Sequence, residues 1–306
     1  DKLPPFPTEI AKSMIEAELG ATVSELFTEF SEPVAAASIA QVHRARLTDT
    51  DEDVAVKVLR PAIERAFRKD IDAFYLAARW IERLAPFSRR LRPLDVIAHF
   101  EGVVAGELDL RLESAAAAEF AANTAKDEGF QVPKPIWSLS SRNVMTLGWA
   151  EGIGLNDLAE IDAAGHDRRV LGARVLQLFL NHALRDGFFH ADMHQGNLKV
   201  AANGDIIAYD FGIMGRIDAY TRRVYAEILM GFIRKDYRRV AEVHFEAGYV
   251  PPNHDVATFA QALRAIGEPL QHRNAGWDGI DDPGPPLEFP GCDRGRDGWM
   301  GEHQQL

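Results

Sequence analysis

The chain has 306 residues, 46% of them hydrophobic and 26% charged, which predicts a soluble globular protein of one large or two small domains. A net charge of −12 makes it a poor match for nucleic acid, whose binding depends on neutralised phosphates. The single cysteine, Cys292, excludes an intrachain disulfide and a multi-cysteine zinc site, and it fits a reducing compartment. The first residues show no signal-peptide pattern, and the sequence contains no run of about 18 consecutive apolar residues. We therefore expect a cytoplasmic chain without a transmembrane helix.

The first 33 residues predict an N-terminal helical extension. Apolar residues recur at helical spacing over 8–19, with Thr8 as the expected N-cap and Gly20 just past the end. A second, short helix follows at TVSELF, where Thr22 and Glu25 form a capping-box pattern.

Residues 34–59 predict strands. VAVKVLR (54–60) places Val54, Val56 and Val58 on one face and Lys57 on the other. The acidic turn TDTDED separates this strand from QVHRARL, so the two segments are expected to form a hairpin.

The remaining pattern predicts an α+β protein with two lobes. Helical spacing covers 63–84 and 94–108, and is expected to continue to about 124; a strand follows at 143–147. These elements complete a strand-rich N-lobe over 34–148. The C-lobe, 149–270, is expected to contain a long apolar helix closed by Gly187, two short strands around an Asn-Gly turn, and helices near 218–234, 236–247 and 254–266. A ligand cleft is expected between the lobes, and the Gly/Pro-rich segment 271–306 is expected to be a disordered or poorly packed tail.

The segment FFHADMHQGN (188–197) follows a predicted apolar helix and contains two histidines, an aspartate and an asparagine within ten residues. His190, Asp192 and Asn197 have the spacing H-x-D-x-x-x-x-N of a kinase catalytic loop, in which the aspartate orients the attacking hydroxyl and the asparagine binds magnesium. Two alternatives stay open. His190, Asp192 and His194 could ligate zinc, although no cysteine completes the site, and His190 could be a buried structural histidine.

Asp210-Phe211-Gly212 ends the strand DIIAYD, thirteen residues after Asn197. A carboxylate there can bridge phosphate oxygens through magnesium, an ion that prefers oxygen ligands. Lys57 in VAVK can hold a phosphate as a point charge, although taken alone a solvated lysine is the favoured interpretation.

The partner of Lys57 is left open by the sequence. Glu107 and Asp109 fall near a predicted helix end, and spacing does not choose among Glu101, Glu107 and Glu113 as the acid that pairs with Lys57. An acidic solvent-facing surface is the alternative. Upstream, the small-residue turn Ala35 to Ser38 stands where a kinase carries a glycine-rich loop, and alanine there narrows the backbone conformations available.

The order of these motifs is that of a protein-kinase-like fold, and the longer strings AAASIAQVHRA, VAVKVLRP, ELDLRLE, FFHADMHQGN and DFGIMGRID resemble the UbiB family of atypical kinase-like proteins, which support ubiquinone biosynthesis. The resemblance covers about residues 4–270. It implies ATP and Mg²⁺ as cofactors, Lys57 on the α/β-phosphates, Asp192 as the catalytic-loop base, Asn197 and Asp210 as magnesium ligands, and Glu107 and Asp109 as an ExD motif near metal and phosphates. It further implies a nucleotide contact at Leu147 and an alanine-rich nucleotide loop made of Val34, Ala35, Ala36, Ala37, Ser38, Ile39, Ala40, Gln41 and Val42.

The resemblance also has departures. In the family a KxGQ motif precedes the PPFP segment, and further helices, often membrane helices, follow the last helix recognised here, so a form truncated at both ends is implied. Gln195 stands where the family usually has proline. The full-length protein would then associate with the inner membrane.

Three functions follow as hypotheses. The first is a UbiB-type ATPase or atypical kinase in ubiquinone biosynthesis, with a quinone precursor or biosynthetic proteins as partners; the second is a small-molecule or protein phosphotransferase; the third is a nucleotide-binding scaffold without turnover. One basic cluster could make a peripheral contact with anionic lipid headgroups, although a solvated helix face is favoured. Its members are Arg79, Arg83, Arg89, Arg90 and Arg92.

Overall fold

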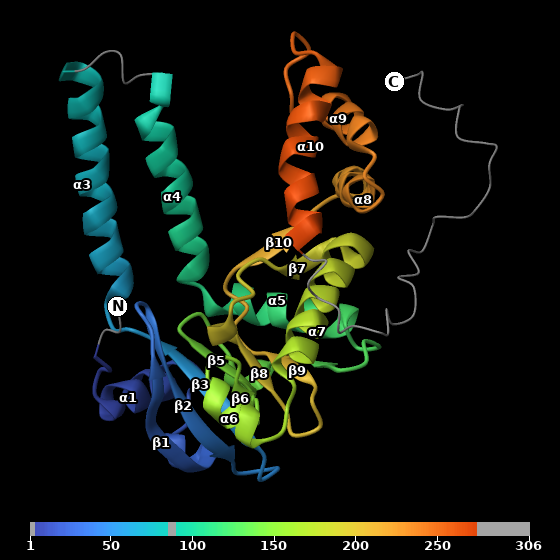
Figure 1. Cartoon of the computed structure of the whole chain (residues 1–306). Coiled ribbons are helices and arrows are strands. Elements are labelled where there is room, and N and C mark those ends of the chain that lie inside the picture. Colours follow the sequence, from blue (N-terminus) through green and yellow to red (C-terminus); the bar gives the residue numbers. More distant parts are fainter. Residues whose placement is uncertain (1–3, 85–89, 274–306) are drawn as a thin grey trace, which may run out of the picture. The chain divides into compact units, whose positions relative to one another are not determined.

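The computed structural model describes residues 4–84 and 90–273, and in this part of the chain helices and strands are mixed as the sequence predicts (Figure 1). Two compact units form. Of the described residues, the first unit contains those up to Phe179 together with Phe189–Gly215, and the second contains Leu180–Phe188 and those from Arg216 to Arg273. The catalytic-loop and DFG segments therefore belong to the same unit as the N-terminal sheet, whereas the predicted lobe boundary lay at residue 148.

A four-stranded antiparallel sheet, ordered β1-β2-β3-β5, is the centre of the first unit. Its strands are β1 (Phe27–Ala36), β2 (Ala40–Leu47), β3 (Asp53–Leu59) and β5 (Val144–Gly148). The predicted hairpin around TDTDED is confirmed, with Val42 opposite Lys57 and Lys57 opposite Met145. The expectation of a helical extension up to residue 33 is wrong in its last part, because the buried Phe27 starts a strand that pairs with β2.

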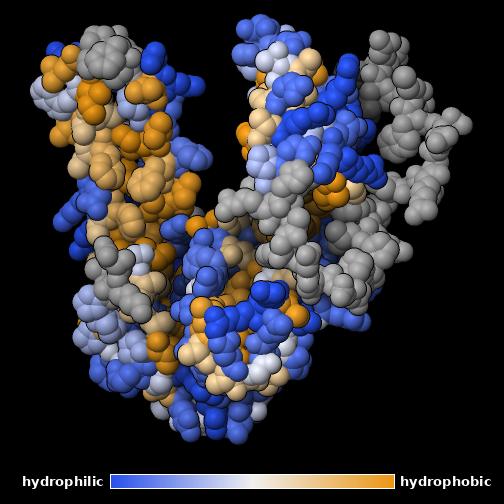
Figure 2. All heavy atoms as spheres, viewed as in Figure 1, coloured by the Kyte–Doolittle hydropathy of each residue, from blue (hydrophilic) through white to orange (hydrophobic). Residues whose placement is uncertain are grey.

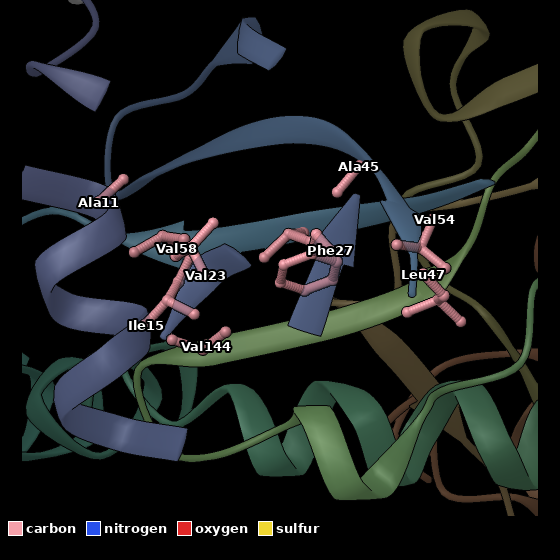
Figure 3. Close-up of a cluster of buried hydrophobic side chains, with 10 residues drawn as sticks. Ala11, Ile15, Val23, Phe27, Ala45, Leu47, Val54, Val58 and Val144 are labelled. Carbon is pink, nitrogen blue, oxygen red and sulfur yellow. The ribbon is translucent and has the colours of Figure 1, made fainter. Parts of the chain in front are cut away.

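One face of the sheet packs against the first two helices, α1 (Thr8–Leu19) and α2 (Val23–Leu26). Figure 3 shows Val54 and Val58 of β3 in a cluster with Ile15 of α1. The predicted valine face is thus confirmed, and it directs Lys57 to the other side of the sheet.

The ends of these two helices test the predicted caps. Gly20 ends α1 in the left-handed conformation, at φ 71°, and the capping box of Thr22 and Glu25 is present. Thr8 is not the N-cap, because Pro7 occupies that position and the Thr8 hydroxyl donates instead to the Glu32 carboxylate.

Two long helices, α3 (Ile63–Leu84) and α4 (Pro93–Glu107), lie side by side (Figure 1). The Tyr75 hydroxyl donates to Glu101 at 2.8 Å, and the rings of Phe74 and Phe100 lie 6.4 Å apart. Figure 2 shows apolar side chains along this pair, several of which are exposed, Trp80 among them.

The expected continuous helix over 94–124 is interrupted. A separate helix, α5 (Leu110–Asn123), starts after Asp109, whose side chain accepts a hydrogen bond from the Arg111 N–H and so caps the new helix. Such a cap competes with continuation of the helix before it. The interruption gives α5 its own direction and brings Glu113 to β3.

The rest of the first unit carries the motif loops. A second sheet is ordered β4-β9-β8-β6, and its β8–β9 hairpin turns at Gly204, φ 87°, as the Asn-Gly pattern predicts. The strands and helices that lie wholly or mostly in this unit are β4 (Phe130–Gln131), η2 (Trp137–Leu139), β6 (Ile153–Gly154), α6 (Leu158–Ala163), α7 (Arg168–Asn181), β7 (Phe188–His190), η4 (Gln195–Asn197), β8 (Leu198–Val200), β9 (Ile206–Ala208) and β10 (Met214–Arg216).

The second unit is helical, and its elements follow the predicted periodicity. A π-helical turn, η3 (His182–Asp186), ends at Gly187 with φ 70°. The three predicted helices are present as α8 (Ala219–Ile233), α9 (Tyr237–Glu246) and α10 (Val256–Arg273). The tail expected over 271–306 lies, from residue 274 onward, outside the described residues. Among the helices that are described, none is long and apolar enough to cross a membrane.

Candidate nucleotide-binding site

A cavity of about 970 Å³ lies in the first unit, at the upper end of the size range for small-molecule sites. The predicted site residues that line it are Val34, Ala35, Ala36, Ala37, Ser38, Ile39, Ala40, Val42, Lys57, Glu107, Leu147, Asp192, Asn197 and Asp210. Two predicted site residues lie elsewhere: Gln41 is buried next to Phe6, and Asp109 is occupied as the cap of α5. The structure therefore brings motifs from distant parts of the sequence around one cavity.

Lys57 and Glu113 form an ion pair in this cavity. The Lys57 Nζ lies 2.7 and 2.8 Å from the two carboxylate oxygens, and both side chains are largely buried, with exposed fractions of 19% and 9%. Among the three acids that the sequence left open, Glu113 is thus the partner; Glu101 bonds to Tyr75, and Glu107 lines the cavity.

The charge of Lys57 is stabilised by its neighbours. Burial alone would lower the pKa of Lys57, but Glu113, Asp210 and Glu107 together outweigh it, and the pKa is raised. The Asp210 carboxylate lies 3.9 Å from Nζ. Lys57 is therefore a permanent cation in this cavity.

The catalytic-loop segment is held by its own polar groups. The Asp192 N–H donates to His190 Nδ1 at 3.1 Å, and Asn197 Nδ2 donates to the Asp192 carbonyl oxygen at 3.0 Å. Burial lowers the pKa of His190, partly opposed by Asp210 and Asp192, so the imidazole is neutral and accepts through Nδ1. His190 is thus a buried histidine that positions the backbone before Asp192.

The zinc alternative finds no support in the part of the chain that the structure describes. No group of three or more His, Cys, Asp or Glu side chains there is arranged to hold a metal ion. The exposed His194 lies with Nε2 3.5 Å from Asp192 Oδ2, while its Nδ1 accepts from the Gly196 N–H. His194 therefore contacts the predicted base and does not complete a ligand set with His190.

The DFG segment contacts both α5 and the catalytic loop. Phe211 is buried, with its ring 6.1 Å from the rings of both Phe120 and His190. The Phe211 N–H points to Glu113 Oε1 at 3.4 Å, and the Gly212 N–H donates to Asp210 Oδ1 at 3.2 Å. Packing of Phe211 under α5 keeps Asp210 in the cavity beside Lys57.

The donor set fits magnesium bound together with phosphates. Mg²⁺ in such sites takes one or two carboxylates plus phosphate oxygens rather than an all-protein cage. Asp210 supplies a carboxylate, and Asn197 uses its NH₂ group on Asp192, which leaves Oδ1 to accept a cation. Glu107 also lines the cavity, whereas both oxygens of Asp109 are bonded by the Arg111 guanidinium at 2.9 and 2.6 Å. Asp210 and Asn197 are thus the residues that could hold such an ion.

A second set of lining residues was missed by the sequence analysis. Lys199 Nζ donates to the Ala150 carbonyl oxygen at 2.8 Å and lies 5.0 and 5.6 Å from the ring centroids of Trp149 and Tyr209. Burial, with a contribution from Arg44, lowers the pKa of Lys199 against the opposing effect of Glu151. In the sequence NLKV the alternation shows that Lys199 faces away from Leu198 and Val200, but it does not show that the cavity lies there.

The alanine-rich segment is a tight turn over this cavity. It joins β1 to β2 through Ala37, Ser38 and Ile39, and the Ala37 N–H donates to the Ala40 carbonyl oxygen at 2.8 Å. Its small side chains line the cavity.

Comparison with known proteins places the chain in a class. Residues 1–244 match the ABC1 atypical kinase-like domain, and the chain belongs to that family. It is 40% identical over 278 residues to "Probable protein kinase UbiB" of Marinobacter nauticus, a match covering 89% of this chain and 51% of the relative. The protein of the same name from Xanthomonas axonopodis pv. citri is also 40% identical, over 284 residues, 89% of this chain and 51% of its own length. This chain therefore spans about half the length of these relatives, and the predicted resemblance to UbiB is confirmed.

A solved structure supports the fold. The complex structure of Rv3197 with erythromycin from Mycobacterium tuberculosis matches with a TM-score of 0.69 at 26% identity, covering 88% of this chain and 68% of that one. The predicted kinase-like α+β fold is confirmed by this match together with the family.

Proposed function

We propose that this chain binds Mg-ATP in the cavity and acts as an ATPase or atypical kinase of the UbiB type, supporting ubiquinone biosynthesis. The observation that carries the proposal is the Lys57–Glu113 ion pair with Asp210 3.9 Å from the same ammonium. In kinases this lysine–glutamate pair and the DFG aspartate must both be in place for phosphoryl transfer.

Each residue then has a role that its surroundings support. Lys57 binds phosphate oxygens, and Glu113 orients Lys57. Asn197 and Asp210 would hold Mg²⁺, which neutralises charge on the phosphates when bound. Asp192 accepts a hydrogen bond from the attacking water or hydroxyl, and the Asn197 amide, 3.4 Å from Asp192 Oδ2, fixes the direction of that carboxylate.

Hydrolysis is favoured over transfer to a protein acceptor. The alanine-rich turn carries methyl groups where glycine would allow a closer and more adaptable backbone over the phosphates. Transfer to a small acceptor such as a quinone precursor is the second candidate, since the Asp192 side chain is 45% exposed and can meet a hydroxyl other than water.

The test is an ATP turnover assay on wild type, Asp192→Asn and Asp205→Asn. Asp205 is the matched control, because this residue of the β8–β9 turn accepts hydrogen bonds from Gln131 of β4 and from Asn203, and it does not line the cavity. We expect magnesium-dependent phosphate release in wild type and in the control, and a loss of at least about 100-fold in Asp192→Asn, as for other general bases. If the ATP is labelled in its γ-phosphate, label that appears on an added phenolic acceptor would indicate phosphoryl transfer to that acceptor instead of hydrolysis. An unchanged rate in Asp192→Asn would contradict the assigned role.

A further inference from the structure

The segment before α1, Pro4–Phe6, contacts the alanine-rich turn through two side chains, and we call this segment the strap. Arg60, at the end of β3, makes the first tie. Its Nη1 donates to the Pro4 carbonyl oxygen at 3.0 Å, while Nε and Nη2 donate to the Ala37 carbonyl oxygen at 3.2 and 3.0 Å. The Arg60 backbone N–H also donates to the Ile39 carbonyl oxygen at 2.8 Å. One arginine thus joins the strap to two residues of the turn.

Gln41 makes the second tie. Its Oε1 accepts from the Phe6 N–H at 3.0 Å, and its Nε2 donates to the Phe6 carbonyl oxygen at 3.2 Å. The Gln41 side chain is fully buried. This explains why Gln41, alone within 34–42, does not line the cavity: its amide is used on the strap.

His43 fixes the orientation of the Gln41 amide. His43 Nδ1 lies 2.8 Å from the Ser31 carbonyl oxygen and must donate to it, so Nε2 is left as an acceptor for Gln41 Nε2 at 3.0 Å. Both Gln41 hydrogens and its oxygen are then matched to partners of the right polarity. Buried polar groups that are fully satisfied in this way specify one arrangement.

We propose that the strap, through Arg60 and Gln41, positions the alanine-rich turn for nucleotide, so that the turn is held in its binding conformation by the chain segment ahead of α1. Arg60 and Gln41 are positioning residues, because neither lines the cavity. The inference rests on the proposed nucleotide site for its functional consequence. The coupling between strap and turn does not depend on it.

The ties should strengthen nucleotide binding because they lower the conformational entropy that the alanine-rich turn loses when a ligand binds. A turn that visits its binding conformation only a tenth of the time binds about tenfold more weakly. Phe6 packs against the apolar cluster under the sheet, so the strap is itself anchored. Ties to an anchored segment restrict the turn without adding any contact to the ligand.

The experiment compares wild type, Arg60→Met, Arg60→Lys and Gln41→Met with the control Arg46→Met. Arg46 is on the same sheet, and its guanidinium pairs with Asp51 and Asp53 instead. Two quantities are measured: amide hydrogen exchange of peptides covering 4–8 and 35–40 without nucleotide, and the Kd for Mg-ATP. Thermal unfolding identifies any variant that is globally destabilised.

We expect Arg60→Met to raise exchange in both peptides and to weaken Mg-ATP binding by about tenfold, as a pre-organising contact should. Gln41→Met should act in the same direction, Arg60→Lys should recover part of the effect, and Arg46→Met should match wild type. Exchange that rises in the strap but not in the turn would overturn the coupling. Increased exchange in the turn with an unchanged Kd would overturn the positioning role. If wild type binds no nucleotide, the proposed function fails, and the exchange data still decide whether strap and turn are coupled.

Discussion

The cavity is lined by two groups of residues that differ in how they are held. In the charged group, Lys57 pairs with Glu113 of α5 and lies 3.9 Å from Asp210 of the DFG segment, while Asn197 bonds to Asp192 within the catalytic loop. The Trp149 group consists of Leu147, Trp149, Lys199 and Tyr209, and the Lys199 ammonium lies over both aromatic rings. Each polar member bonds to a neighbour outside the group and to no other member: Lys199 to the Ala150 carbonyl oxygen, the Tyr209 hydroxyl to the Gly196 carbonyl oxygen, and Trp149 Nε1 to the Glu151 carboxylate. Changes in the charged group should therefore affect stability and turnover, whereas changes in the Trp149 group should affect nucleotide affinity.

Removing Lys57 tests the charged group most strongly. Lys57→Met leaves the Glu113 carboxylate buried without its cation, so the free energy of unfolding should fall by about 3–5 kcal/mol. Urea unfolding measures this. Lys57→Met combined with Glu113→Leu should recover much of the loss, because the buried Glu113 carboxylate is then removed, and the remaining Asp210 carboxylate is partly exposed to solvent. A loss below about 1 kcal/mol in the single variant would mean that the pair behaves as an exposed ion pair.

Acidification tests the buried histidines. Burial lowers the pKa of His190 and of His43 from the ordinary 6.5, so below that pH the unfolded chain takes up protons that the folded chain does not. Stability should therefore fall as the pH drops from about 7.5 to 6, by up to about 1.4 kcal/mol per pH unit for each histidine. Urea unfolding at the two pH values measures the slope. His190→Asn should make it shallower, and an unchanged slope would show that His190 does not contribute.

Lys199 tests the Trp149 group and should give the smallest effect. Lys199→Met keeps the length of the side chain but removes the ammonium near the two rings, so the KM for ATP should rise by about two- to tenfold while kcat stays the same. Steady-state kinetics separates the two constants. A fall in kcat with an unchanged KM would place Lys199 with the charged group.

The sequence predicts the charged group better than the Trp149 group for a physical reason. Catalytic-loop and DFG residues need fixed spacings, since their side chains must converge on one ion, and Asp192, Asn197 and Asp210 carry that pattern. The Trp149 group carries no such spacing requirement, because aromatic and apolar surfaces occur in many sequences. Trp149 and Tyr209 therefore give no local signal, and a lysine at position 199 matches the pattern of an ordinary solvent-facing residue of a short strand.

The partner of Lys57 shows a different limit. Spacing alone did not choose among three glutamates, because the choice depends on where the helix is interrupted. Continuous helix was expected through 94–124, whereas the Asp109 cap starts α5 anew and turns Glu113 towards β3. The same cap removes Asp109 from the cavity. A single Asx cap thus decides two site assignments, and the helical periodicity on either side of it does not reveal the interruption.

The central claim is that Asp210 and Lys57 form a site for nucleotide with magnesium, and thermal unfolding of wild type and Asp210→Asn with Mg-ATP or with ATP and EDTA tests it most directly. A ligand at a hundred times its Kd adds about 2.7 kcal/mol to the free energy of unfolding. We predict an upward shift in wild type that requires magnesium and that is lost in Asp210→Asn. Equal shifts in both proteins, or none in wild type, would contradict the account.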